Sequence, residues 1–236
     1  MFETDNTILS ALSPADRSLV APLLERVELK QGETLFTPHD LAGNAYFFEG
    51  GLASEIAIGE GSDRIEIGCV GREGFSPVSL LFEVDRPQHQ TIMQVGGAAR
   101  CIEASDLAWA IKQSETLRTT LLRYAYVFLL QIASTTLAAG RYSVEKRLAR
   151  WLLMCSDRLG DDLNVTHDFL AMMLGVRRPS VTDALHLLEG KHALKAERNF
   201  IKVRSRQKLM EIASASYGVA EAEYRRLIMP GLPEQQ

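Results

Sequence analysis

The periodicity of apolar residues changes once along this chain, close to residue 105. Between about Val27 and Glu103, short segments such as "RIEIGCVGREGF" alternate apolar and polar residues and are separated by glycines. A period of two predicts half-buried antiparallel strands, and many short strands with glycine turns indicate a sandwich or a rolled barrel. Beyond residue 105 the apolar residues follow helical spacing. The sequence therefore predicts an α+β chain with a β-rich first part and a mainly helical second part.

Helix start and stop signals predict where the helices lie. Ser13 can cap a lead-in helix that has Pro14 at its first position, before the strands begin. After the strands, Ser105 is the expected cap of a short helix, and Gly140 is the expected end of the long helix that follows it. A further amphipathic helix is expected over residues 143–160. We therefore expect Gly140 to be the hinge between two parts of the chain.

The long helix has more apolar surface than one domain face needs. Its apolar residues alternate at spacings of three and four, which is the pattern of a coiled-coil seam, although the seam is short and contains polar residues. We expect this seam to join two copies of the chain in a homodimer. The alternative is a helix that the β-rich part covers. The expected interface residues are Leu117, Leu121, Tyr124, Phe128 and Gln131.

Charge is distributed unevenly along the chain, whose formal net charge is -4. Residues 1–140 carry 10 Lys and Arg against 18 Asp and Glu, whereas residues 141–210 carry 14 against 8 and residues 211–236 carry 2 against 4. A basic segment in an acidic protein indicates a polyanion as its partner. A merely solvated surface would not explain the clustering.

The segment "HDFLAMMLGVRRPSVTDAL" has the pattern of a helix-turn-helix. This motif requires a small residue in its first helix, a glycine at the turn and an apolar residue inside its second helix. Ala171, Gly175 and Val181 occupy these places. The same spacing occurs in ordinary helical hairpins, so the basic residues around the motif are what favour a DNA-binding interpretation.

A basic segment follows the second helix of the motif. The stretch "LLEGKHALKAERNFIKVRSRQKL" indicates a helix that stops at Gly190 and then two short strands around a turn at Arg198 and Asn199. This is the pattern of the wing in a winged helix-turn-helix. Its cations would contact phosphates, which provide affinity but no sequence choice. They are Lys191, Lys195, Arg198, Lys202, Arg204 and Arg206.

The order of these features over residues 14–210 resembles the Crp-Fnr family of bacterial transcription regulators. The resemblance implies a cyclic-nucleotide-binding-like β-barrel of the jelly-roll type at residues 1–110. It implies a dimerisation helix at residues 111–140 and a winged helix-turn-helix domain with a C-terminal extension at residues 141–236. Its implied partners are a second copy of the chain, a palindromic operator in double-stranded DNA, and RNA polymerase. No secretory leader or bilayer-length apolar run is apparent, so we expect a cytoplasmic protein without a membrane partner.

The resemblance also assigns roles on the second helix of the motif. Arg178 stands where the family has an arginine that contacts guanine, and an arginine can donate two hydrogen bonds to the guanine edge. Pro179 departs from the family pattern, which often has a cytosine-reading glutamate there, so the usual operator cannot be assumed. Asp183 is a polar candidate that is equally well explained as a solvated helix residue. The remaining candidates for DNA contacts are Arg177, Ser180 and Thr182.

The expected effector pocket departs from family members that bind cyclic AMP. In those members a Gly-Glu pair holds the ribose, and an Arg-Ser or Arg-Thr pair holds the cyclic phosphate. Here Gly74 matches the glycine, but Phe75 or Ser76 stands in place of the acidic residue. The pair Gln90 and Thr91 stands in place of the arginine pair. Without an arginine, the desolvated phosphate would meet no fixed positive charge. We therefore expect a pocket that does not bind cyclic AMP.

Other cofactors have little support in the sequence. Three scattered cysteines cannot supply the four thiolates of an iron-sulfur cluster, and the histidines lack the spacing of a zinc site, so we expect no cofactor and no metal. His39 or Cys69 as a haem ligand, and Cys69 or Cys101 as a redox switch, are alternatives to ordinary loop and core residues.

Enzyme motifs are also missing from the sequence. We find no nucleophile elbow, P-loop or dinucleotide fingerprint, so we do not expect an enzyme. Glu73, Asp85 and His89 are the polar candidates in a barrel cleft, and their arrangement suggests no reaction. The alternative function is a signalling protein that responds to a cyclic nucleotide or another small molecule and whose helix-turn-helix binds proteins.

Overall fold

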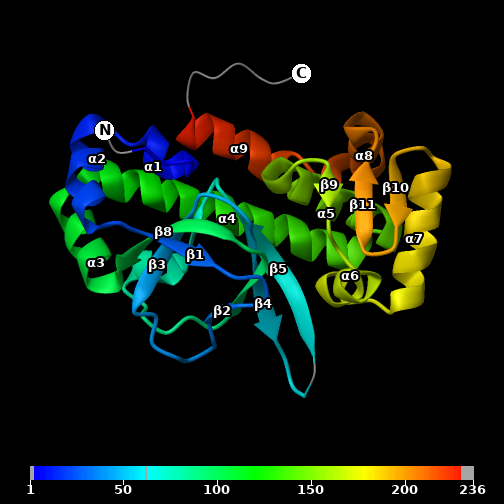
Figure 1. Ribbon diagram of the computed structural model, residues 1–236, viewed down its shortest axis with the longest axis horizontal. Coiled ribbons are helices and arrows are strands. Elements are labelled where there is room, and N and C mark those ends of the chain that lie inside the picture. The colour runs from blue at the N-terminus through cyan, green and yellow to red at the C-terminus, as the bar shows by residue number, and fades with distance from the viewer. Residues whose placement is uncertain (1–2, 62, 230–236) are drawn as a thin grey trace.

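The first half of the chain is built from two antiparallel sheets (Figure 1). The computed structural model describes residues 3–61 and 63–229. One four-stranded sheet has the order β1-β8-β3-β6, and the other has the order β2-β7-β4-β5. The strands are β1 (Glu25–Leu29), β2 (Thr34–Phe36), β3 (Asn44–Phe48), β4 (Leu52–Ile58), β5 (Arg64–Val70), β6 (Phe75–Ser76), β7 (Gln90–Val95) and β8 (Gly97–Glu103).

The two sheets share one apolar core. Phe47 and Ala99 of the first sheet lie in the same buried cluster as Ala53 and Met93 of the second. The sheets do not close into a continuous cylinder, which a jelly roll does not require. The predicted jelly-roll fold is confirmed, and we call residues 25–103 the barrel.

Short helices flank the barrel. Ser13 caps α2 (Pro14–Val20) by accepting a hydrogen bond from a backbone N–H, as predicted, and α1 (Thr7–Ala11) precedes it. α3 (Ala104–Gln113) has no side-chain cap. The prediction that Ser105 caps this helix is wrong, because β8 leads into α3 without a loop and Ser105 is already helical.

The long helix α4 (Glu115–Arg141) extends across most of the molecule (Figure 1). Ser114 caps it by accepting a hydrogen bond from the N–H of Leu117. The predicted end at Gly140 is wrong by one residue, because Gly140 is helical and the chain leaves α4 through the extended backbone of Tyr142 and Ser143. These two residues, rather than Gly140, connect the halves of the chain.

One stripe of α4 packs against the chain's own barrel. Leu117 and Leu121 are each 1% exposed, and the side-chain oxygen of Gln131 accepts a hydrogen bond from the N–H of Cys69 in β5 at 2.7 Å. A stripe that is buried within one chain cannot also be a surface for a second copy. The predicted interface is therefore corrected, and the alternative of a helix covered by the barrel holds for this face. The residues concerned are Leu117, Leu121, Tyr124, Phe128 and Gln131.

The opposite face of α4 is exposed. Tyr126, Leu129 and Leu137 are 48%, 59% and 51% exposed, and the helical period places Leu122 and Ala133 on the same side. Among the described residues, α4 is also the one helix that could cross a membrane by length and composition alone. Of its most apolar window, 39% is buried inside the protein.

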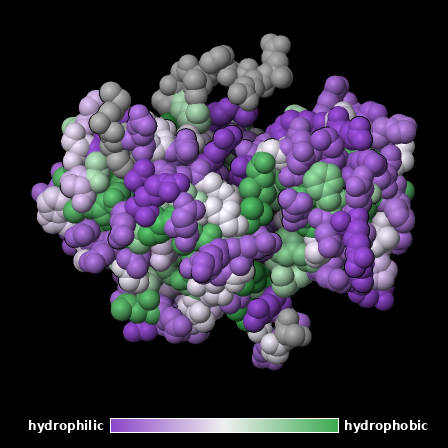
Figure 2. Space-filling view, viewed as in Figure 1, coloured by the Kyte–Doolittle hydropathy of each residue, from purple (hydrophilic) through white to green (hydrophobic). Residues whose placement is uncertain are grey.

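The second half of the chain is helical and carries a small three-stranded sheet. Its core is continuous with the barrel, because Leu52, Ile56 and Cys69 lie in the same buried cluster as residues of α5 to α8. Hydrophilic residues cover most of this half on the face shown in Figure 2. The elements are α5 (Val144–Leu159), β9 (Asp162–Leu163), α6 (His167–Leu174), α7 (Arg178–Gly190), β10 (Leu194–Glu197), β11 (Phe200–Val203), α8 (Arg206–Ala213) and α9 (Val219–Ile228).

Candidate nucleic-acid interface

Helices α6 and α7 form a helix-turn-helix. Thr166 caps α6 by accepting a hydrogen bond from the N–H of Phe169 at 3.1 Å. Gly175 ends α6 in the left-handed conformation, with φ +59° and ψ 42°. α7 then begins at Arg178 with Pro179 in its first turn, where a backbone N–H has no partner inside the helix. The structure thus has the turn that the sequence predicts.

The motif residues occupy the places that a helix-turn-helix requires. Val181 is 0% exposed and Ala171 is 9% exposed, so both are buried in the core of this half. Gly175 has a second role, because a Cβ there would lie 3.0 Å from Cδ1 of Ile65 in β5. The turn is therefore specified by its own backbone and also by close contact with the barrel.

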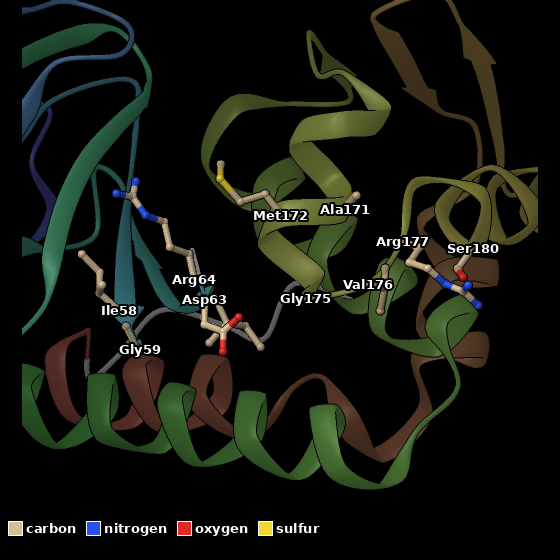
Figure 3. A pocket seen from close by; sticks show the side chains of 12 residues that line it. Ile58, Gly59, Asp63, Arg64, Ala171, Met172, Gly175, Val176, Arg177 and Ser180 are labelled. Atoms are coloured by element: carbon tan, nitrogen blue, oxygen red, sulfur yellow. The ribbon is translucent and has the colours of Figure 1, made fainter. Parts of the chain in front are cut away.

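The first residues of α7 line a groove that they share with the barrel. In Figure 3, Arg177 and Ser180 lie on the opposite side of Gly175 from Asp63 and Arg64 of the β4–β5 hairpin. The hairpin and the turn border an open groove of about 1010 Å³. No side chain caps the N-terminus of α7. The N-terminus of α7 therefore presents two exposed arginines, Arg177 and Arg178, which suit a phosphate or a base edge.

Two of the predicted DNA-contacting residues also have partners on α6. Nε of Arg178 lies 3.4 Å from Oδ1 of Asp168, and both side chains are mostly exposed, so this ion pair is weak. The hydroxyl of Thr182 lies 3.2 Å from Nδ1 of His167 and is therefore turned partly toward α6. Asp183 is exposed.

Strands β10 and β11 form the predicted wing. They pair antiparallel with Lys195 opposite Lys202, and Asn199 takes the left-handed conformation in the turn between them, with φ 61°. Gly190 is the last residue of α7, as predicted, but the left-handed residue that follows the helix is His192. The wing thus lies directly after the exposed helix.

Two lysines of the basic segment, Lys202 and Lys191, form ion pairs at the surface. Nζ of Lys202 lies 2.9 Å from Oδ1 of Asp162, and Nζ of Lys191 lies 2.6 Å from Oε1 of Glu145. The two lysine side chains are 45% and 52% exposed. Such pairs are worth about 1 kcal/mol or less each. A phosphate can therefore replace these carboxylates at small cost.

The residues expected in the effector pocket fill the barrel instead of lining an open site. Phe75 is 0% exposed, and Gly74 lies so close to Tyr124 that a Cβ would collide with the ring. Thr91 is also fully buried, and its hydroxyl donates a hydrogen bond to Oε2 of Glu55 at 3.0 Å. The position expected to face a cyclic phosphate therefore faces a carboxyl group.

Sequence reasoning missed Glu55. Its carboxyl also accepts a hydrogen bond from the hydroxyl of Ser76 at 2.5 Å, and burial raises its pKa above the usual value. The available signal was a glutamate within the mainly apolar strand "ASEIAI". Gln90, by contrast, has a buried side-chain oxygen without a hydrogen-bond partner.

A second buried carboxyl, that of Glu66 in β5, lies where the barrel meets α5. Nε1 of Trp151 donates a hydrogen bond to its Oε1 at 2.8 Å, and the hydroxyl of Ser54 bonds to its Oε2. Burial raises the pKa of Glu66 to about 7, while these hydrogen bonds and the charges of Arg150 and Arg158 act to lower it. The joint between the halves therefore contains a group that titrates near neutral pH.

The candidates for other chemistry do not come together. Within residues 3–61 and 63–229, no group of three His, Cys, Asp or Glu residues is placed to hold a metal ion. Burial raises the pKa of the Cys69 thiol, whereas a reactive thiolate requires a lowered one. Glu73 is already paired with Arg158 at 2.6 Å.

The geometry of the second half agrees with a comparison against protein families. Residues 146–212 match the model of the Crp-like helix-turn-helix domain. The chain carries a Crp-like helix-turn-helix domain. We call these residues the Crp-like domain; it contains most of α5, the helix-turn-helix and the wing. No curated protein matches the chain.

Solved structures of Crp/Fnr regulators share the fold of most of the chain. FixK2 from Bradyrhizobium japonicum aligns with a TM-score of 0.69 at 16% identity, over 81% of this chain and 98% of that one. The c-di-GMP-responsive regulator CLP from Xanthomonas campestris gives 0.68 at 18% identity, over 82% and 100%. A Crp/Fnr regulator from Eubacterium rectale gives 0.68 at 16% identity, over 87% and 97%. At these identities the likeness establishes the Crp/Fnr fold.

Proposed function

We propose that this protein is a sequence-specific transcription regulator that binds a palindromic operator in double-stranded DNA as a homodimer. The exposed first turn of α7 carries the proposal, because Arg177 and Arg178 lie there beside the basic wing. Positive charge at a helix N-terminus opposes the helix dipole and costs stability. A phosphate and a guanine edge would offset that cost. The domain therefore has a charge arrangement that suits DNA.

A salt titration of binding to a duplex of random sequence tests the DNA-binding function. Because phosphate contacts release counterions, we expect the logarithm of the binding constant to fall linearly with the logarithm of salt concentration. Binding should be easily measured at low salt. If the folded protein fails to bind the duplex at low salt, the proposal is overturned, and the alternative of a helix-turn-helix that contacts proteins is favoured.

The exposed face of α4 supports the homodimer. Leu122, Tyr126, Leu129, Ala133 and Leu137 follow one another at spacings of three and four on the side opposite the barrel. Two such stripes can pack together as a short coiled coil. The interface thus moves to this face from the buried stripe that the sequence suggests. A two-fold axis along α4 would also relate two recognition helices, as a palindrome requires.

A charge placed on this face should break the dimer. We expect Leu129→Glu to sediment as a monomer at concentrations where the wild-type protein is a dimer, because a carboxylate would be buried without a partner. Met210→Glu is the matched control, since Met210 is 48% exposed on α8 and lies outside α4. A folded Leu129→Glu variant that still forms dimers would exclude this interface.

We also propose that the barrel does not bind cyclic AMP. Phe75 occupies the core, and the hydroxyl of Thr91 is directed to Glu55. An entering cyclic phosphate would be desolvated beside a carboxyl group instead of an arginine, which is unfavourable. We therefore expect calorimetric titration with cyclic AMP to give no saturable heat. Saturable binding would show that the barrel can reorganise to admit the nucleotide.

A further inference from the structure

The helix α9 lies outside the Crp-like domain and does not pack on that domain alone. The family match ends at residue 212, and the chain continues through a short 3-10 turn at Ser214–Ser216. Gly218 then takes φ +108° and precedes α9. Figure 1 shows α9 running beside α4, which it contacts along its length. The chain thus returns from the Crp-like domain to the other half of the molecule.

The apolar face of α9 belongs to the core of the barrel half. Ala220, Tyr224 and Ile228 recur every four residues, and all three are buried. They lie in the same apolar cluster as Phe75 of the barrel and Tyr124 of α4. This face is therefore covered by the chain itself and is not a free surface.

Two contacts from the second half meet at one residue of the barrel. The hydroxyl of Tyr224 donates a hydrogen bond to the backbone carbonyl of Glu73 at 2.7 Å. The carboxylate of the same residue pairs with Nη2 of Arg158 in α5 at 2.6 Å, and the Arg158 side chain is 7% exposed. Glu73 is thus held by its side chain from α5 and by its backbone from α9.

The segment before α9 is fixed to the Crp-like domain. Nε of Arg150 donates a hydrogen bond to the carbonyl of Ser216 at 2.8 Å. The hydroxyl of Tyr217 donates to Oδ2 of Asp157 at 2.7 Å, and Arg206 bonds to both of these residues. Arg206, which the sequence places among the phosphate contacts, therefore has a structural role. The segment is anchored at one end in the Crp-like domain and at the other in the barrel.

We propose that residues 213–229 are a strap that holds the Crp-like domain in one orientation on the barrel. In this arrangement Glu73 is the residue through which the barrel alters the contacts of the strap. Glu73 lies three residues before Ser76, whose hydroxyl bonds Glu55 inside the barrel. A rearrangement of the barrel interior that moves this short segment would alter the contacts of Arg158 and Tyr224 together. The orientation of the DNA-binding helix is thereby linked to the interior of the barrel.

Hydrogen exchange on the full-length protein without DNA tests the strap. Tyr224→Phe removes only the hydroxyl that reaches Glu73, so we expect amides in residues 71–76 and 219–228 to exchange about fivefold faster, as the loss of one hydrogen bond predicts. Tyr142→Phe is the matched control, because Tyr142 lies between α4 and α5 and outside the proposed strap. It should leave residues 71–76 unchanged. Equal exchange at residues 71–76 in Tyr224→Phe and wild type would overturn the role of Glu73.

A distance measurement tests whether the strap fixes the orientation. Spin labels on Glu28→Cys and Lys195→Cys, in a Cys101→Ser background, report the separation of the barrel and the wing. We expect a narrow distribution of distances that broadens in Tyr224→Ala. An unchanged distribution of distances in folded Tyr224→Ala would show that α9 does not fix the orientation of the Crp-like domain. If that variant does not fold, the exchange result for Tyr224→Phe decides. Neither measurement uses DNA, so each stands apart from the proposed DNA-binding function.

Discussion

The Glu66→Gln variant should lose much of the pH dependence of stability that the wild-type protein shows between pH 5 and pH 8. Burial raises the pKa of Glu66 from 4.5 to about 7. A carboxyl group with a raised folded-state pKa contributes stability below its unfolded pKa, and that stability is lost as the pH rises through the folded value. The wild-type protein should therefore lose about 3 kcal/mol through this group as the pH rises from 4.5 to 7.

Denaturant unfolding at a series of pH values measures this effect. The amide of the Glu66→Gln variant keeps an acceptor for Trp151 and a donor for Ser54 but does not titrate, so the stability of the variant relative to wild type should rise with pH. The contribution of the other buried carboxyl, that of Glu55, is common to both proteins and cancels in the comparison. Glu60→Gln, at the exposed tip of the same hairpin, is the control and should follow wild type. Parallel curves for Glu66→Gln and wild type would exclude this assignment.

The position of Glu66 gives this titration a structural consequence. Its hydrogen bond to Trp151 joins β5 to α5, and α5 is packed in the same core as α6 and α7. A charge on Glu66 therefore weakens the joint between the barrel and the Crp-like domain as well as the fold as a whole. The chain has 2 tryptophans, Trp109 and Trp151. In a Trp109→Phe background the tryptophan fluorescence would come from Trp151 and would report directly on this joint.

The parts of the structure that the sequence predicts well are those specified by local patterns. The turn at Gly175, the proline in the first turn of α7 and the wing turn at Asn199 each depend on the conformational preference of one or two residues. The period of two in the strands is equally local. These features therefore follow from the sequence without knowledge of distant contacts.

The features that the sequence could not predict depend on contacts between distant residues. Both faces of α4 are apolar, so spacing alone does not tell which face the barrel buries. Gln131 lies on the buried face, where its side-chain oxygen accepts a hydrogen bond from the N–H of Cys69. Glu55 and Glu66 become internal only through partners from other elements. Tyr224 meets Glu73 across 151 residues of sequence. No local pattern encodes these pairings.

Arg178→Ala should reduce the discrimination between the preferred operator and random DNA by about 5- to 150-fold for each half-site. A bidentate contact to guanine contributes roughly 1 to 3 kcal/mol of discrimination, and a symmetric dimer would lose it in each half-site. The exposed pair with Asp168 does not compete strongly, because its Nε to Oδ1 distance is 3.4 Å and both side chains are solvated. Alanine is compatible with the first position of α7, so the helix should persist.

Lys202→Ala is the matched contrast, because it removes a cation of the wing instead of one at the start of α7. Affinity should fall alike for operator and random duplexes, and the salt dependence should flatten by about one phosphate contact per subunit. The two variants together separate base reading from phosphate contact. If Arg178→Ala weakens both duplexes equally, Arg178 contacts only the backbone. Sequence choice would then have to come from the other polar candidates at and after the start of α7 or from the shape of the DNA, since Pro179 has no side-chain group that donates or accepts a hydrogen bond.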